Sequence, residues 1–187
     1  MKLKNYIAGQ WIEGSGNEIP LYNAVNGELV AISDTEGIDF ESALHYGRTV
    51  GYKNLSSMTF YDRGEMLKKV ALYLLERKKK YYDLSYKTGA THADSWVDIE
   101  GGFGTFFTYS GLAKRMLPNT PFWVDGDTQK ISANGTFLGT HILTPSEGVS
   151  VQINAYNFPV WGMLEKLSTS LLAGVPSIVK PATPGSY

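Results

Sequence analysis

Apolar residues recur at helical spacing through most of the first two thirds of the chain. Residues 39–52 predict one helix, and residues 60–79 predict a stronger one with a continuous apolar face. That face is formed by Met66, Leu67, Val70, Ala71, Leu74 and Leu75. Ser57 or Thr59 can cap the second helix, because a short hydroxyl side chain accepts a hydrogen bond from a free backbone N–H group there. The first part of the chain is therefore predicted to be helix-rich.

The next stretch continues the helical pattern with one interruption. A helix is expected over residues 81–88, Gly89 supplies a left-handed stop, and helical spacing resumes at Trp96. The basic run 77–80 is interpreted as the end of the preceding helix, where cations complement the helix dipole. Residues 101–104 (Gly-Gly-Phe-Gly) follow no apolar strand and lack the full phosphate-loop pattern, so they predict close helix packing.

Two hairpins are predicted outside the helices. Residues 6–12 predict a small hairpin near the start of the chain. Residues 130–133 and 136–143 alternate on either side of an Asn-Gly dipeptide, which is a hairpin turn signal. An isolated two-stranded ribbon is marginally stable in water. The ribbon, taken as residues 128–143, is therefore expected to extend another sheet or to contact a neighbouring subunit.

Near its end the chain changes to an apolar strand, a turn, an amphipathic helix and a second strand. Val149, Val151 and Ile153 are predicted to point inward from the first strand. Pro159 is expected to begin the helix, and Lys180 closes the second strand. Strands joined by such a helix run parallel with a right-handed crossover. The predicted fold class is α/β: a helix-rich chain with a partial Rossmann-like parallel sheet.

Composition and charge narrow the classes of partner. The chain has 187 residues, of which 43% are hydrophobic and 19% charged, as in an ordinary globular domain. A formal net charge of -1 recommends neither nucleic acid nor an anionic membrane as partner. The first residues lack the apolar segment of a signal peptide, and no later segment approaches the ~20 apolar residues of a membrane span. A cytoplasmic protein is therefore expected.

The inventory of reactive side chains is restrictive. Cysteine is absent, which excludes disulfides, thiolate metal sites and a cysteine nucleophile within these residues. The three histidines lie far apart and none has a partner at metal-ligand spacing, so no metal site is predicted. Asp94, Asp98 and Glu100 could be taken for acid and base groups, but carboxylates on a helix are more often solvated or capping residues.

Two polar residues follow the two predicted parallel strands. Asn157 comes soon after the first strand, and Lys180 ends the second. Open α/β sheets bind ligands at the carboxyl ends of their strands, so an amide donor and a cation can address one bound molecule there. From the residues alone, a turn-forming role for Asn157 is the commoner one.

This unit resembles the cofactor-binding unit of the aldehyde dehydrogenase superfamily. The family's signature is an apolar strand, a Pro-Trp-Asn-Phe-Pro turn, a helix ending in Ala-Gly and a strand ending in Lys-Pro-Ala-Glu. This chain has Ala-Tyr-Asn-Phe-Pro at 155–159, Ala-Gly at 173–174 and Lys-Pro-Ala-Thr at 180–183. The resemblance implies the N-terminal part of the aldehyde dehydrogenase fold and a nicotinamide dinucleotide cofactor.

The resemblance also implies residue roles. Asn157 would donate its side-chain amide to the aldehyde oxygen as that atom becomes a tetrahedral oxyanion. Lys180 would hydrogen-bond the adenosine ribose, and the backbone of Asn154, Ala155 and Tyr156 would line the same groove. Ala155 and Tyr156 replace the family's usual proline and tryptophan, so packing around the turn is expected to differ.

Thr183 stands where many NAD-dependent relatives carry glutamate. A carboxylate there would accept hydrogen bonds from the ribose diol and repel a 2'-phosphate, whereas threonine removes that repulsion and offers a hydroxyl donor. NADP is therefore expected, with NAD less favoured. The alternative is that Thr183 merely faces solvent, because cofactor choice is also set elsewhere.

Residues 93–102 (Ala-Asp-Ser-Trp-Val-Asp-Ile-Glu-Gly-Gly) look like the phenylacetic acid degradation branch of the superfamily, which oxidises an acyl-CoA semialdehyde. The family's nucleophilic cysteine, general-base glutamate and pyrophosphate-binding turn lie further along a complete chain. The expectation is an N-terminal segment of an NADP-dependent semialdehyde dehydrogenase, inactive alone and forming homo-oligomers. One alternative is a non-catalytic nucleotide-binding or subunit-assembly module, and another is a generic doubly wound binding protein.

Overall fold

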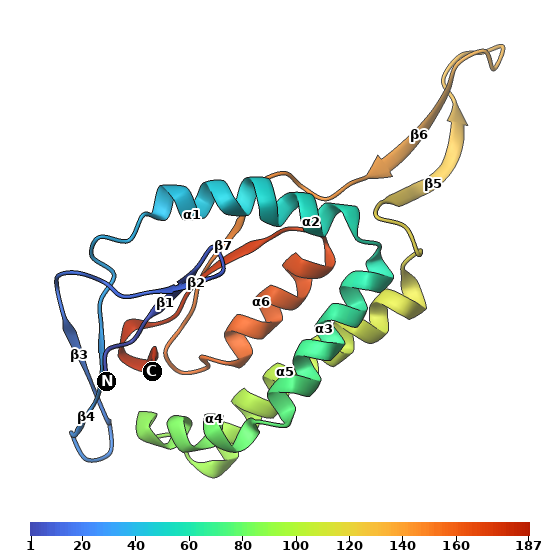
Figure 1. The fold of residues 1–187 in the computed structure, drawn as a ribbon. Helices are drawn as coiled ribbons and strands as arrows, with labels where there is room; N and C mark the ends of the chain where they lie inside the picture. Colours follow the sequence, from blue (N-terminus) through green and yellow to red (C-terminus); the bar gives the residue numbers. More distant parts are fainter.

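The computed structural model describes residues 1–187 and shows a helical body with four separate two-stranded sheets, one of which projects as a ribbon (Figure 1). The α-helices are α1 (Phe40–Tyr46), α2 (Tyr52–Ser57), α3 (Phe60–Leu75), α4 (Lys78–Ser85), α5 (His92–Met116) and α6 (Trp161–Leu172). The strands are β1 (Asn5–Ile7), β2 (Gln10–Ile12), β3 (Ile19–Tyr22), β4 (Leu29–Ser33), β5 (Trp123–Lys130), β6 (Leu138–Leu143), β7 (Ser150–Ile153) and β8 (Ser177–Lys180). None of the helices is both long enough and apolar enough to cross a bilayer.

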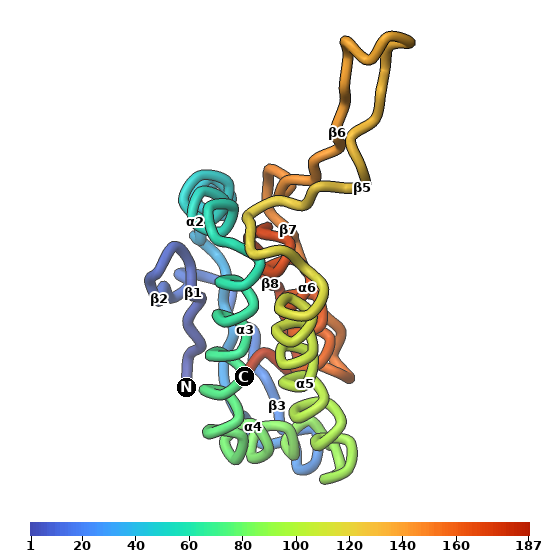
Figure 2. The backbone as a smooth tube through the Cα atoms, turned by 90° about the vertical axis from the view of Figure 1, so that its right-hand side faces the viewer, coloured from blue at the N-terminus to red at the C-terminus, as the bar shows by residue number.

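The core lies between α3, α5 and α6, which run side by side (Figure 2), with α4 adding one tyrosine. Its buried residues are Leu67, Ala71, Tyr82, Ile99, Phe103, Phe106, Ala113, Leu164 and Leu172. A Cβ atom at Gly64 would lie 2.7 Å from the Cβ atom of Ala113. Glycine at position 64 therefore lets α3 approach α5 at backbone distance.

The start of α3 is as predicted, but its end is not. Thr59 caps the helix in a capping box with Asp62. The predicted helix over 60–79 breaks after Leu75, and α4 begins at Lys78. The basic run 77–80 is therefore not the end of one helix. The Arg77 side chain donates to the Tyr73 carbonyl of α3 at 3.0 Å, while the three lysines form the first residues of α4.

Those lysines stand in the first turn of α4, where the helix dipole disfavours cations. Two of them have carboxylate partners that offset this position: Lys78 bonds Glu100 at 3.0 Å and Lys79 bonds Asp83 at 2.8 Å. The α4 helix then ends through a 3-10 turn (Tyr86–Thr88) at Gly89, whose φ of 88° is the predicted left-handed stop.

The predicted helix over 39–52 is longer in the structure. Helices α1 and α2 are joined without a break by a π-helical turn, Gly47–Gly51, so the helix continues to Ser57. A Cβ atom at Gly47 would lie 2.7 Å from the Val149 side chain, and one at Gly51 would lie 3.0 Å from the Pro176 side chain. The two glycines therefore let this long helix lie against the chain just before β7 and β8.

The N-terminal hairpin formed by β1 and β2 confirms the prediction for residues 6–12. A second hairpin, β3 with β4, was not predicted. Only Leu21 and Ala31 are buried on this hairpin, so its strands show little alternation, and Pro20 weakens the strand signal further.

The predicted ribbon is present, but its boundaries differ. Strands β5 and β6 pair antiparallel from Trp123 opposite Leu143 to Lys130 opposite Leu138. The first strand thus begins earlier than predicted. The tip is a longer loop in which Gly135 donates to Ser132, rather than a two-residue turn. The ribbon stands away from the helical body (Figures 1 and 2).

Strands β7 and β8 pair in parallel around α6, which confirms the predicted strand, helix, strand unit. Two of the three predicted inward residues were wrong: Val151 is 62% exposed and Ile153 74% exposed, whereas Val149 is partly buried and Gln152 is 3% exposed. Gln152 donates to Ser170 of α6 at 3.4 Å and to Ser177 of β8 at 3.2 Å. Alternation shows which residues share a face of a strand, but not which face a helix covers.

Candidate functional site

The carboxyl ends of β7 and β8 meet at one edge of the parallel pair. Ile153 stands opposite Lys180 at the last paired position. The Asn154 N–H continues the pairing by donating to the Lys180 carbonyl at 3.0 Å. The segment that leads from β7 to Asn157 and the segment that leads from β8 to Thr183 therefore leave the sheet at the same edge.

Asn157 lies in the bend between β7 and α6. Its side chain is exposed and has no hydrogen bond within the chain, so its amide is available to a ligand. The residues around it are held more firmly. The preceding Tyr156 donates its hydroxyl to the Thr88 carbonyl at 3.1 Å, and the Phe158 carbonyl accepts from the Gly162 N–H at 3.0 Å.

Asn154 contributes more than the predicted backbone. Its side chain is buried, and its Oδ1 atom accepts a hydrogen bond from Lys166 Nζ at 3.0 Å. The same ammonium donates to the Gly162 carbonyl at 2.6 Å, so it joins the end of β7 to the start of α6. The Asn154 Nδ2 atom is buried and has no hydrogen-bond partner within the chain. Lys166 was not singled out from the sequence.

Lys180 and Thr183 meet in the turn after β8. The Lys180 Nζ atom lies 3.3 Å from Thr183 Oγ1, and Thr183 begins a short 3-10 turn (Thr183–Gly185). The lysine is exposed and has no carboxylate partner. A cation beside a hydroxyl, with no acidic side chain in the turn, is a donor set that fits ribose hydroxyls or a phosphate.

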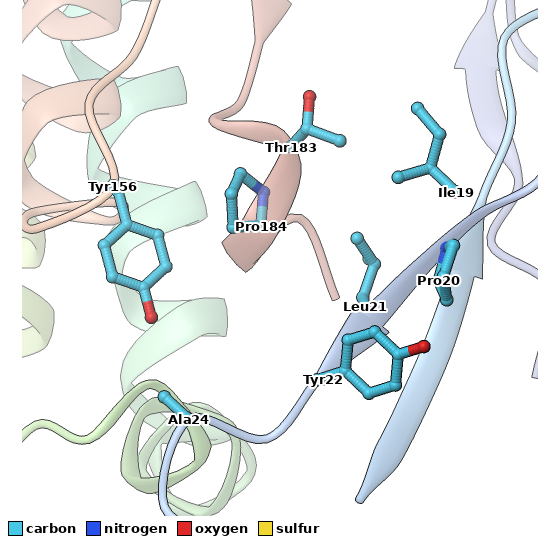
Figure 3. Close-up of a pocket in the computed structure, with 8 residues that line it drawn as sticks. All are labelled: Ile19, Pro20, Leu21, Tyr22, Ala24, Tyr156, Thr183 and Pro184. Atoms are coloured by element: carbon cyan, nitrogen blue, oxygen red, sulfur yellow. The ribbon is translucent and has the colours of Figure 1, made fainter. Parts of the chain in front are cut away.

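A small pocket of about 280 Å³ lies between this turn and β3 (Figure 3). It is lined by Ile19, Pro20, Leu21, Tyr22, Ala24, Tyr156, Thr183 and Pro184. The pocket brings Tyr156 and Thr183, two of the residues singled out from the sequence, to one place. No charged side chain lines it, so it suits an apolar group next to the polar edge.

The three acidic residues of α5 have separate structural roles. Asp94 forms a capping box with Thr91 at the start of α5, and Glu100 accepts from Lys78 and Tyr82 at 3.0 Å each. The pKa of Tyr82 is raised to about 12, mainly by burial and secondly by its hydrogen bond to the Glu100 carboxylate. Asp98 is buried and bonds the start of α6 rather than its own helix. Hence none of them is an exposed acid or base beside Asn157.

A sequence model of the aldehyde dehydrogenase family matches residues 11–186. Among curated proteins, the chain is 38% identical to 3,4-dehydroadipyl-CoA semialdehyde dehydrogenase of Aromatoleum evansii, over 100% of this chain and 36% of the relative. It is 24% identical to the D-glyceraldehyde dehydrogenase (NADP(+)) of Picrophilus torridus, over 97% of this chain and 35% of that protein. The chain thus spans about a third of the length of these relatives.

Solved structures show the same fold. A 3,6-anhydro-L-galactose dehydrogenase in complex with NAP superposes with a TM-score of 0.82 at 24% identity, covering 98% of this chain and 37% of that one. A betaine aldehyde dehydrogenase from Staphylococcus aureus in complex with NAD+ gives 0.78 at 23% identity, covering 97% and 35%. With the family match over nearly the whole sequence, the chain belongs to the aldehyde dehydrogenase family.

Proposed function

We propose that residues 1–187 provide the oxyanion-stabilising amide and one side of the dinucleotide groove of an NADP-dependent dehydrogenase that oxidises an acyl-CoA semialdehyde. The observation that carries this proposal is the edge of β7 and β8. There two backbone segments leave the parallel pair at the same edge. One leads to Asn157, whose amide has no partner, and the other carries Lys180 and Thr183. The similarity to 3,4-dehydroadipyl-CoA semialdehyde dehydrogenase supports the substrate class.

The proposed role of Asn157 is electrostatic. Its Nδ2 group would donate to the aldehyde oxygen, and the hydrogen bond strengthens as negative charge develops on that oxygen. A donor placed in this way usually contributes ~2.7 to 4 kcal/mol to the barrier reduction. The bound dinucleotide supplies the hydride acceptor for the oxidation.

Lys180 and Thr183 would bind the adenosine half of the cofactor. The ammonium is a point charge that can bond ribose oxygens or a phosphate, and the Thr183 hydroxyl adds a neutral donor. A neutral side chain at position 183 does not repel a 2'-phosphate, which favours NADP over NAD. The backbone of Asn154, Ala155 and Tyr156 would form the wall of the groove beside them.

The 187 residues contain no cysteine, so the thiolate that attacks the aldehyde in this family would come from outside them. We therefore expect no aldehyde oxidation by residues 1–187 alone. A second candidate function, a subunit-assembly module, is favoured by the ribbon that projects from the body and carries exposed apolar side chains such as Phe137 and Leu138.

The direct test compares residues 1–187 with a full-length protein that carries them. Each is mixed with 3,4-dehydroadipyl-CoA semialdehyde and either NADP or NAD, and reduced cofactor is measured by its fluorescence. We expect turnover only by the full-length protein, and faster with NADP at equal subsaturating concentrations. Semialdehyde-dependent turnover by the 187-residue chain, or none by the full-length protein with either cofactor, would contradict the proposal.

A further inference from the structure

Asp98 is a buried carboxylate without a cationic partner. Its residue is 4% exposed, and neither of its oxygens forms an ion pair. They accept instead from two backbone N–H groups, that of Trp161 at 2.8 Å and that of Val160 at 3.1 and 3.3 Å. Burial raises the pKa of Asp98, and these two hydrogen bonds oppose the rise. A buried carboxylate is costly unless hydrogen-bonded, so these two N–H groups are essential to its position.

Helix α6 has no cap from its own sequence. Its first residues include no acidic side chain, and Val160 at the cap position offers no side-chain acceptor. Pro159 lacks a backbone N–H group altogether. Asp98 reaches across from α5 and supplies both the acceptor and the negative charge that the N-terminus of a helix favours.

The face of α5 around Asp98 is shaped to receive this turn. Gly101 and Gly102 follow Asp98 at three and four residues, which places all three on one side of the helix. A Cβ atom at Gly102 would lie 3.1 Å from the backbone N and Cα atoms of Trp161, and one at Gly101 would lie 2.9 Å from the Trp161 ring. The absence of side chains there lets the start of α6 lie against the backbone of α5.

We propose that Asp98 is a positioning residue for the Asn157 amide, which it holds in place through the backbone of Val160 and Trp161. This inference rests on the proposed oxyanion role of Asn157. The exposed Asn157 has no partner of its own, so the direction of its side chain depends on the backbone around it. That backbone is fixed after Asn157 by Asp98, and before it by the bond from Tyr156 to Thr88.

The test is a double-mutant cycle in the full-length enzyme. Asp98→Asn keeps the side-chain shape but can offer only one acceptor oxygen to the two N–H groups. Its matched control is Glu100→Gln, a carboxylate on the same helix that bonds α4 instead of the turn. Gly102→Ala independently perturbs the same contact between α5 and the start of α6. Its control is Gly104→Ala, where an added Cβ atom meets nothing within 4 Å.

Asp98→Asn and Gly102→Ala are each expected to lower kcat about 10- to 100-fold, since a small misplacement of a catalytic group has effects of this order. KM for NADP should stay within about threefold, because Asp98 and Gly102 meet Val160 and Trp161 rather than Lys180 or Thr183, the proposed cofactor-binding side chains. Both controls should keep kcat near that of the wild type. Combining Asp98→Asn with Asn157→Ala should give little further loss beyond Asn157→Ala alone, as expected of residues that act as a unit.

Three outcomes decide the matter. An unchanged kcat in Asp98→Asn, or effects of Asp98→Asn and Asn157→Ala that multiply in the double variant, would overturn the positioning role while leaving the oxyanion role intact. An unchanged kcat in Asn157→Ala would overturn the proposed function and the positioning role with it. If Asp98→Asn does not fold, the same cycle with Gly102→Ala gives the answer.

Discussion

The ammonium of Lys180 lies 3.3 Å from the hydroxyl oxygen of Thr183, so the last residue of β8 and the first residue of the following 3-10 turn present a cation and a neutral donor together. Cofactor choice should depend on the charge at position 183. Thr183→Glu is expected to lower the ratio of kcat/KM for NADP to kcat/KM for NAD by about tenfold or more, because the new carboxylate repels a 2'-phosphate. Thr183→Gln is the matched control, because glutamine has the size of glutamate without its charge. An equal ratio in wild type and Thr183→Glu would refute the assignment.

The Lys180 side chain itself should contribute to cofactor affinity. Lys180→Met keeps the length of the side chain and removes the charge, so it should weaken dinucleotide binding about 10- to 100-fold, the range expected for hydrogen bonds to a charged group. At saturating cofactor, kcat should change little. Lys53→Met, at an exposed site on α2, is the control. Isothermal titration with NADP measures both, and equal affinities in the two variants would remove Lys180 from the groove.

The ribbon should carry a subunit contact. Leu138 on β6 is 59% exposed, far from the helical core, and an exposed apolar ribbon is stabilised when another chain covers it. Leu138→Lys is expected to lower the oligomeric order measured by light scattering after size-exclusion chromatography. Leu29→Lys, at a residue on β4 that is 56% exposed, should not. If both variants keep the mass of the wild type, the ribbon is not the contact.

Most of the secondary structure and the parallel unit could be predicted from the sequence, because local signals and helical spacing agree there. Thr59, Gly89 and Gly174 act as their residue types predict: the first caps a helix, and the two glycines have φ values of 88° and 83° after helices. The break between α3 and α4 was missed because residues 76–80, Glu-Arg-Lys-Lys-Lys, contain no glycine or proline that would signal a helix end. At the break the Arg77 N–H donates to the Leu74 carbonyl and its side chain donates to the Tyr73 carbonyl, while Lys78 and Lys79 pair with carboxylates of α5 and α4.

The site was predicted less completely than the fold. The turn residues at 154–157, with Lys180 and Thr183, follow from the family resemblance, and the structure brings their backbone segments to one edge. The contact between Asp98 and α6 spans sixty-two positions of sequence and has no periodic signal. The only sequence signal for this contact was the spacing of Asp98, Gly101 and Gly102. Taken alone, that spacing indicates only close helix packing. The burial of Gln152 in place of Val151 likewise depends on which sheet face α6 covers.

Acid should destabilise the fold through its capping carboxylates. The side-chain hydrogen bond from Thr59 is the main cause that lowers the pKa of Asp62, and the bond from Thr91 does the same for Asp94. A carboxyl whose folded pKa lies below its unfolded value stabilises the fold above the unfolded value and loses that contribution as pH falls through the folded one. The loss is therefore expected below about pH 4, near the ordinary pKa of aspartate.

Asp62→Asn tests this sign. The variant should be less stable than wild type at neutral pH, because the amide is a weaker partner than the carboxylate for the Thr59 side of the capping box. The difference should shrink at about pH 3.5, below the ordinary aspartate pKa of about 3.9, because the unfolded chain takes up protons there. Urea unfolding followed by circular dichroism at both pH values measures it. A difference that grows on acidification would contradict the assigned direction. For Asp98→Asn, the stability difference from wild type should instead grow on acidification, because burial raises the pKa of Asp98 in the folded protein.

The oxyanion role of Asn157 is tested most directly by the kcat of Asn157→Ala in the full-length enzyme, with semialdehyde and NADP both saturating. Loss of one oxyanion donor should lower kcat about 10²- to 10³-fold, while KM for NADP remains close to the wild-type value. Asn157→Asp, which replaces the donor with a negative charge, should lower kcat at least as much. A kcat within twofold of wild type in Asn157→Ala would contradict the account.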